Sequence, residues 1–239
     1  MNALKRLTFA CLILFCFPAI WRLAGQARAA SPAQADAGDA TLAGLEKRMQ
    51  PIASSRSVFR QERHLSLFDQ PLVAEGVMFF QAPGFIRWET TKPYRSAFLS
   101  DGANAAQFEW IDGRRRKLKI DFPRSLSKVI EHMSLMNQGR LGPAKENFNI
   151  TASTGKTAVI NMTPRDDRAK AFLSSIEIRM APDLSATREI LMNEPGGDFT
   201  RITIVKEDRN IVLPASAFDM NDPADIEVLI NAPSNISRP

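Results

Sequence analysis

The sequence predicts a mainly β fold, a curved antiparallel sheet or barrel of about eleven strands with a few helices. Three observations lead to this prediction. Short segments with apolar residues at alternate positions follow one another along the chain, and residues typical of tight turns separate them. Neither internal repeats nor the long crossovers of parallel sheets intervene between these segments.

Residues 1–30 are expected to be a signal peptide that is removed on export. Lys5 and Arg6 precede an apolar run over residues 7–21, and small residues lead up to Ala29, where a signal peptidase cleaves well. The apolar run is shorter than the ~20 residues that span a bilayer, which argues against a membrane anchor. The mature protein is therefore expected to be exported.

Removal of this segment changes what the composition implies. Cys11 and Cys16 both lie in it, so the mature chain is expected to have neither a disulfide nor a lipid anchor. Four of the 31 Lys and Arg residues also leave, and the remaining 27 face 26 Asp and Glu residues, a net charge of +1. A nearly neutral chain is not typical of a nucleic-acid-binding protein.

The basic run Arg114–Lys117 follows the hairpin-turn signal Asp112–Gly113. We interpret this run as the exposed flank of a turn. The alternative is contact with an acidic partner or with anionic lipid head groups.

Residues 41–230 are expected to form a single domain, with disordered segments at 31–40 and 231–239. The predicted strands are residues 57–68, 74–81, 85–90, 95–100, 106–112, 116–122, 146–153, 156–163, 174–181, 187–194 and 199–207. Two stretches have the helical period instead, residues 41–49 and 125–138.

Alternation within the strands predicts one apolar and one polar face. In the run "FIRWE", Ile86 and Trp88 share the apolar face. Phe85, Arg87 and Glu89 share the other, which is expected to be in contact with water. The same parity, continued along the chain, adds to the apolar face Met78, Phe80, Phe98, Phe108, Trp110, Leu118, Ile120, Phe148, Ile150, Ile160, Met162, Ile176, Ile178, Ile190, Ile202 and Ile204.

The two helical stretches are too small to cover such a sheet completely. One alternative is that the sheet rolls up and fills its interior with its own side chains. The other is a concave apolar cavity, partly covered by the helices, that holds an aliphatic ligand.

Motifs of enzyme active sites are absent from the sequence. It contains no nucleophile elbow, no HExxH zinc motif and no phosphate-binding glycine loop. The histidines, His64 and His132, are isolated and are interpreted as surface residues, and the Asp166–Asp167 pair as a solvated turn. We therefore expect no catalytic residues, no metal site and no cofactor.

Several short motifs occur in a definite order along the chain. They are Phe59 with Gln61, Pro71–Leu72 with Gly76 and Phe80, Pro83–Gly84 with the run Ile86–Glu89, Pro93, and Ser100–Asp101–Gly102. Together with the closing stretch from Phe218 to Val228, this order resembles the periplasmic outer-membrane lipoprotein carrier family, LolA. The resemblance extends from about residue 41 to residue 228.

The resemblance implies an open antiparallel half-barrel with a helical lid and an apolar cavity that holds the acyl chains of lipoproteins. It also implies a periplasmic location, an inner-membrane transporter that supplies the cargo and an outer-membrane receptor that accepts it. We expect a monomer that does not bind nucleic acid. A carrier of another lipid, such as a polyene or a glycolipid, and a periplasmic scaffold or sensor with a closed core remain as alternatives.

At the strands that match the family's motifs, the resemblance implies that the cavity is lined by Phe80, Ile86 and Trp88. Strand parity and motif position add Phe59, Met78, Phe98, Phe108, Trp110 and Ile120. The lid residues expected from the helical pattern are Leu45, Met49, Ile130, Met133 and Met136. Many carriers of this type have a basic residue just before the Pro of the "PG" motif, which bonds to the lid, whereas here the nearby polar residue is Gln81.

Overall fold

The computed structural model describes residues 41–49, 51–118, 134–135 and 138–231 of the chain. The predicted signal peptide and the segment before residue 41 lie outside these ranges, as do residues 232–239. Most of the predicted helix over 125–138 lies outside them too.

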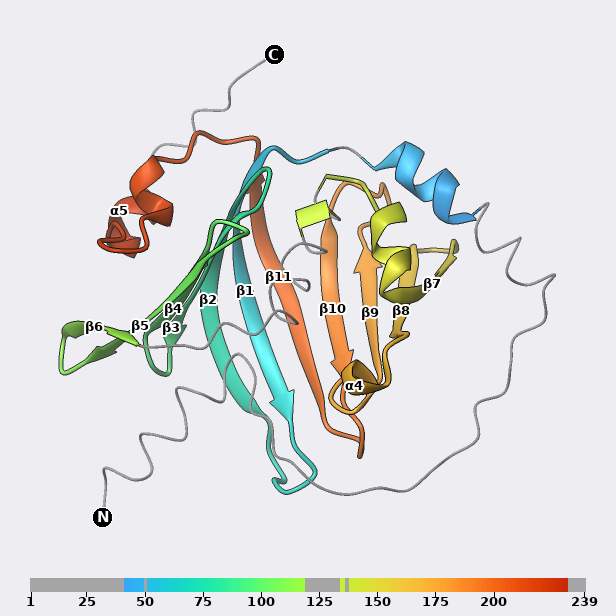
Figure 1. Ribbon diagram of the computed structural model, residues 1–239, viewed down its shortest axis with the longest axis horizontal. Helices are drawn as coiled ribbons and strands as arrows, with labels where there is room; N and C mark the ends of the chain where they lie inside the picture. The colour runs from blue at the N-terminus through green and yellow to red at the C-terminus, as the bar shows by residue number, and fades with distance from the viewer. Residues whose placement is uncertain (1–40, 50, 119–133, 136–137, 232–239) are drawn as a thin grey trace.

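In the described part of the chain, eleven antiparallel strands form one sheet (Figure 1). The strands are β1 (Ser54–His64), β2 (Leu72–Gln81), β3 (Phe85–Lys92), β4 (Ser96–Ser100), β5 (Ala105–Ile111), β6 (Arg114–Leu118), β7 (Phe148–Ser153), β8 (Val159–Pro164), β9 (Ser175–Met180), β10 (Thr187–Asn193) and β11 (Phe199–Arg209). The predicted mainly β class is confirmed.

The strand order shows how the sheet is built from two meanders. It runs β6-β5-β4-β3-β2-β1-β11-β10-β9-β8-β7, so each half follows the chain and the pairing of β1 with β11 joins the halves. Within the described residues the sheet is open, because β6 and β7 are the two ends of this order. Figure 1 shows that the sheet curves, so that one of its faces is concave.

Turn residues place the strand ends close to where the sequence predicts them. Asp112 and Gly113 have φ angles of 51° and 75°, which both lie in the left-handed region that a tight hairpin between β5 and β6 requires. The first predicted strand was too long at its C-terminal end. β1 stops at His64, and in the loop that follows the Phe68 amide donates to the Leu65 carbonyl over 2.9 Å.

The helical segments lie on opposite faces of the sheet. A helix over residues 41–48 and the 3-10 helix η1 (Gly142–Glu146) pack against the apolar face of β7, β8 and β9. The 3-10 helix η2 (Ala215–Phe218) and the helix α5 (Ile226–Asn231) pack on the other face, against β2. The short helix α4 (Asp167–Lys170) connects β8 to β9, and Asp166 caps it by accepting from the Arg168 amide over 2.7 Å.

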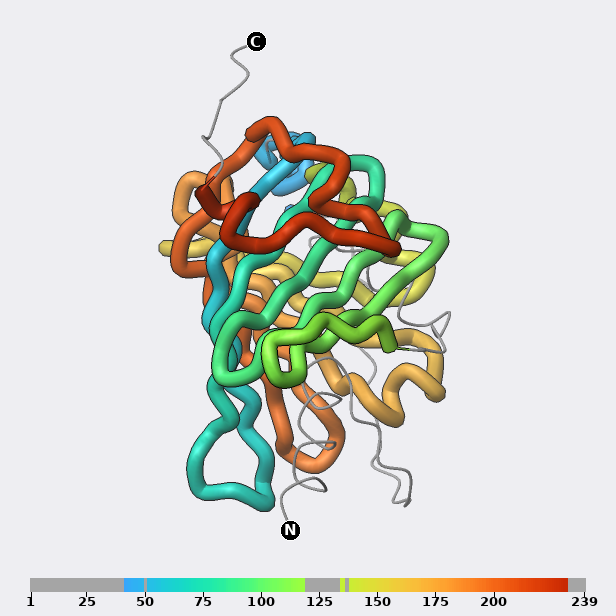
Figure 2. The backbone as a smooth tube through the Cα atoms, turned by 90° about the vertical axis from the view of Figure 1, so that its left-hand side faces the viewer, coloured from blue at the N-terminus to red at the C-terminus, as the bar shows by residue number. Residues whose placement is uncertain are grey.

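The outer face of β2 to β5 is covered by residues 211–231, which we call the C-terminal segment. Figure 2 shows this segment crossing these strands on the convex side of the sheet. Arg87 and Glu89 lie beneath it with side chains that are 0% exposed. The prediction that this face is in contact with water was therefore wrong, because a distant part of the chain excludes solvent from it.

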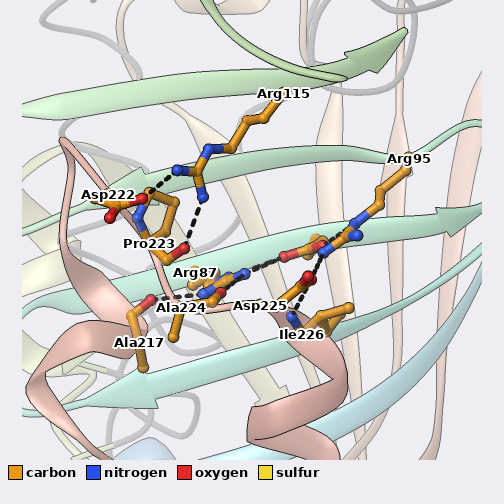
Figure 3. Close-up of polar contacts among 10 residues, drawn as sticks. Arg87, Arg95, Arg115, Ala217, Asp222, Pro223, Ala224, Asp225 and Ile226 are labelled. Atoms are coloured by element: carbon orange, nitrogen blue, oxygen red, sulfur yellow. Dashed lines mark hydrogen bonds and ion pairs between the residues drawn. The ribbon is translucent and has the colours of Figure 1, made fainter. Parts of the chain in front are cut away.

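Arginine side chains hold the C-terminal segment on this face (Figure 3). Arg87 binds Glu89 Oε2 through Nε and Nη2, at 2.9 and 2.5 Å. It also donates to the carbonyls of Ala217 and Ala224, over 3.0 and 2.9 Å. These two carbonyls come from different parts of the C-terminal segment, so a single guanidinium joins both of them to β3.

Two further arginines extend this contact. Arg95 binds Glu89 Oε1 at 2.8 Å and Asp225 Oδ1 at 2.5 Å, and its hydrogen bond lowers the pKa of the Asp225 carboxyl from the ordinary value. Arg115 pairs with Asp222 and donates to the Pro223 carbonyl over 2.8 Å. The basic run after the β5–β6 turn is thus only partly a solvated flank, because Arg115 contacts an acidic residue of the same chain.

Candidate ligand-binding face

The concave side of the sheet carries a continuous set of apolar side chains, which we call the apolar face. Residues paired across antiparallel strands lie on the same face of a sheet. Met78 pairs with Trp88, Trp88 pairs with Phe98, and Phe80 pairs with Ile86. These five residues were predicted to share a face, and the strand pairing confirms it.

The apolar face continues across the junction of the two meanders. Phe59 of β1 pairs with Ile204 of β11, and Ile190 of β10 pairs with both Ile202 and Ile178. The same pairing pattern brings in the following predicted residues: Leu118, Phe148, Ile150, Ile160, Met162 and Ile176. The apolar face therefore spans both halves of the sheet.

Two predicted residues lie on the opposite face. Phe98 pairs with Gln107, so Gln107 lies on the apolar face. Phe108, the next residue on β5, therefore lies on the outer face, where it pairs with Ala97. Phe108 packs in an outer cluster with Leu99. The Arg95 guanidinium lies over the Trp110 ring, with Arg95 Cζ 4.0 Å from the ring centroid. The prediction for Phe108 and Trp110 was wrong. Alternation fixes which residues share a face within one strand, but the length of the turn sets the register with the next strand and so decides which of its residues lie on that face.

Trp88 is the meeting point of two groups of apolar side chains. One group contains Phe80, Ile86 and Phe98, the other contains Phe59 and Met78, and Trp88 packs against both. The ring centroids of Trp88 and Phe59 are 4.2 Å apart. Phe59 and Phe80 are 1% and 0% exposed, whereas Trp88 is only partly buried.

The predicted lid residues that the structure describes lie over the far end of the apolar face. Leu45 is 1% exposed and, with Leu42, packs against the β7–β9 side of that face, and Met49 packs at the edge of the same cluster. Glu46 fastens this helix to the chain before η1, because its Oε1 accepts from the amides of Leu141 and Gly142 over 2.5 and 2.6 Å. Ile120, Ile130, Met133 and Met136 lie outside the described residues.

Replacing Glu46 with Ala is expected to lower the free energy of unfolding by about 1–3 kcal/mol, because two backbone amides lose a charged acceptor. Urea unfolding followed by circular dichroism measures this change. Lys47→Ala is the matched control, since Lys47 is an exposed neighbour on the same helix. Equal stability of the two variants would show that the Glu46 contact does not hold the helix.

Sequence reasoning missed other contributors to the face. Met192 lies two residues after Ile190 on β10, and the alternation that found Ile190 also indicates Met192. The Pro83 carbonyl, at the β2–β3 turn, accepts hydrogen bonds from the Ser134 hydroxyl and from Gln138 Nε2, the latter over 3.3 Å. No sequence pattern indicates these hydrogen bonds to Pro83, because the donor residues are more than fifty positions away along the chain.

The described residues hold no group of three or more His, Cys, Asp or Glu side chains that would bind a metal ion. His64 stacks on Phe199 with ring centroids 4.2 Å apart. Within the same ranges no helix is long and apolar enough to cross a membrane.

The fold and the apolar face together define a class of protein, an open antiparallel sheet whose concave apolar side is partly covered by helices. Residues 52–221 match the family described as outer membrane lipoprotein carrier protein LolA. This chain belongs to the LolA family.

Individual relatives are distant. An outer-membrane lipoprotein carrier protein from Bordetella avium is 26% identical over 154 residues, which are 64% of this chain and 70% of that protein. A solved LolA superfamily protein from Nitrosomonas europaea is 9% identical with a TM-score of 0.43, over 77% of this chain and 98% of that one. A DUF1329 family protein from Desulfovibrio piger is also 9% identical, with a TM-score of 0.45 over 80% and 99% of the two chains.

Proposed function

We propose that this protein is a periplasmic carrier that binds the acyl chains of lipoproteins on its apolar face and takes them from the inner to the outer membrane. The observation that carries the proposal is the apolar face itself, which extends across both meanders of an open sheet. An acyl chain binds such a face by burying apolar surface, which contributes about 25 cal/mol of favourable free energy per Å² removed from water.

The role in transport rests on membership of the LolA family and on the carrier from Bordetella avium. It requires an inner-membrane transporter that loads the protein and an outer-membrane receptor that unloads it. The protein acts as a monomer in this proposal and performs no chemical reaction, because transfer needs only differences in affinity among the three proteins.

A second candidate is a periplasmic scaffold or sensor whose sheet is filled by its own side chains. The near-complete burial of Phe59 and Phe80 favours it. The two candidates differ in whether an added acyl chain finds a place on the apolar face.

The test uses protein expressed from the full sequence and purified after export. A fluorescent acyl probe is titrated, and then displaced with a triacylated lipopeptide or with the same peptide lacking its acyl groups. Saturable binding and displacement by the acylated form alone are expected. A folded protein that binds neither the probe nor the lipopeptide would overturn the carrier proposal in favour of the closed core.

A matched pair of variants on β10 locates the site. Met192 lies on the apolar face, whereas the adjacent Leu191 pairs with Arg201 and Glu177 on the outer face. Met192→Glu is expected to weaken probe binding at least tenfold, since a carboxylate beside an acyl chain is desolvated without a partner. Leu191→Glu is expected to leave the affinity unchanged, and equal losses in both variants would remove the apolar face as the site.

Native mass spectrometry of the protein from its own host identifies the cargo. A bound lipoprotein adds kilodaltons, whereas a polyene, glycolipid or phospholipid adds far less. This measurement separates the lipoprotein carrier from a carrier of another lipid.

A further inference from the structure

The apolar face contains polar atoms that are buried and have no hydrogen-bond partner in the described part of the chain. They are the indole Nε1 of Trp88 and the hydroxyls of Ser55 and Thr90. Ser55 and Thr90 are 1% and 0% exposed. Such atoms are uncommon, since about 90% or more of buried polar groups in proteins have a partner.

Trp88 and Thr90 are neighbours on this face, and Ser55 lies on the same face two strands away. Ser55 pairs with Phe80, which pairs with Ile86, and Thr90 pairs with Gly76. Ile86 and Thr90 are the residues two before and two after Trp88 on β3, so Thr90 is adjacent to Trp88 on this face, whereas Ser55 lies two strands away in the row of Ile86. Two of the unpartnered atoms, on Trp88 and Thr90, therefore lie at adjacent positions of β3, where the two groups of apolar side chains meet.

The chemistry of the indole restricts what could be its partner. Trp Nε1–H is a donor and never an acceptor, so only an acceptor atom satisfies it. Leaving a buried donor unpaired is destabilising, and a ligand that supplies an acceptor would remove this destabilisation on binding. A plain hydrocarbon chain supplies none, whereas an acylated lipid has a carbonyl oxygen at the head of each chain.

We propose that the apolar face binds an acyl chain together with its ester or amide carbonyl, and that Trp88 Nε1 donates a hydrogen bond to that carbonyl oxygen. This inference rests on the proposed function and narrows its ligand class. The ligands are O-acyl or N-acyl lipids, and polyenes and ether lipids of the same length bind more weakly. Trp88 thus contributes specificity as well as apolar area.

The experiment compares two lipids with identical chains, a diester and the diether in which each carbonyl is replaced by a methylene group. Exported wild-type protein is expected to bind the diester about fivefold more tightly, the ratio that one net hydrogen bond gives. Trp88→Phe keeps an aromatic ring but removes the N–H, so it is expected to bind both lipids with the wild-type affinity for the diether. Trp110→Phe makes the same chemical change on the outer face and is expected to keep the fivefold ratio.

A second measurement does not depend on a Trp88 variant that folds. In the ¹⁵N spectrum of indole-labelled protein, with Trp88 assigned by use of Trp110→Phe, the Trp88 N–H proton is expected to shift downfield with the diester and much less with the diether. Equal affinities for the two lipids, a fivefold ratio that persists in Trp88→Phe, or equal proton shifts would each overturn the inference. Equal binding of both lipids leaves the carrier proposal standing, whereas failure to bind either lipid contradicts the proposed function itself.

Discussion

Replacing Arg87 with Met is expected to lower the free energy of unfolding by about 3–5 kcal/mol, because it leaves the fully buried Glu89 carboxylate without its closest cation. The same change removes the donors to the carbonyls of Ala217 and Ala224. The C-terminal segment should therefore become more accessible to protease as stability falls. Urea unfolding and limited proteolysis measure the two effects.

Arg179→Met is the matched control for Arg87→Met. Arg179 pairs with Glu177 and Glu189 on the outer face, but its side chain is 49% exposed. An exposed ion pair contributes about 0–1 kcal/mol, so this variant should remain close to wild type. Similar losses in the two variants would contradict the conclusion that burial makes the Arg87 pair important. Glu89→Leu added to Arg87→Met should recover part of the stability, since it removes a buried carboxylate that keeps only Arg95 as a cationic partner.

Gly76→Ala is expected to destabilise the protein by about 3 kcal/mol, at the upper end of the range for overpacked interiors. A Cβ at this position would lie 2.1 Å from the Glu89 carbonyl oxygen and 2.7 Å from Phe59 Cζ. The ring can turn away, but the Glu89 backbone is held, because β3 is paired with β2 on one side and β4 on the other. Thermal unfolding followed by circular dichroism measures the loss.

Gly44→Ala is the control for added volume. Gly44 lies in the helix over residues 41–48, and no atom of the described residues comes within 4 Å of a Cβ added there, so Ala should stabilise the protein by up to about 1 kcal/mol. Phe59→Leu in the Gly76→Ala background separates the two clashes. Little recovery is expected, since the backbone oxygen is the closer atom, and full recovery would show that the ring causes the loss.

Part of the candidate site is local and could be predicted from the sequence. Within a strand, alternate residues must face the same way, so Ile86 with Trp88 and Met78 with Phe80 follow from their spacing alone. Between strands the prediction depends on register. It was right where Trp88 pairs with Phe98 and wrong one strand later, where the β4–β5 turn places Gln107 opposite Phe98 and turns Phe108 and Trp110 outward.

The sequence by itself determined the mainly β class, the number of strands and the positions of their turns, because period-two alternation and turn residues act over a few neighbours. Its motif order was also enough to indicate the LolA family. The tertiary structure alone decided that Arg87 and Glu89 are buried, that Gly76 has no room for a side chain and that the Trp88 indole has no hydrogen-bond partner among the described residues. These properties depend on segments that are distant along the chain, since burial and hydrogen bonding belong to whatever packs against a residue and not to its own spacing.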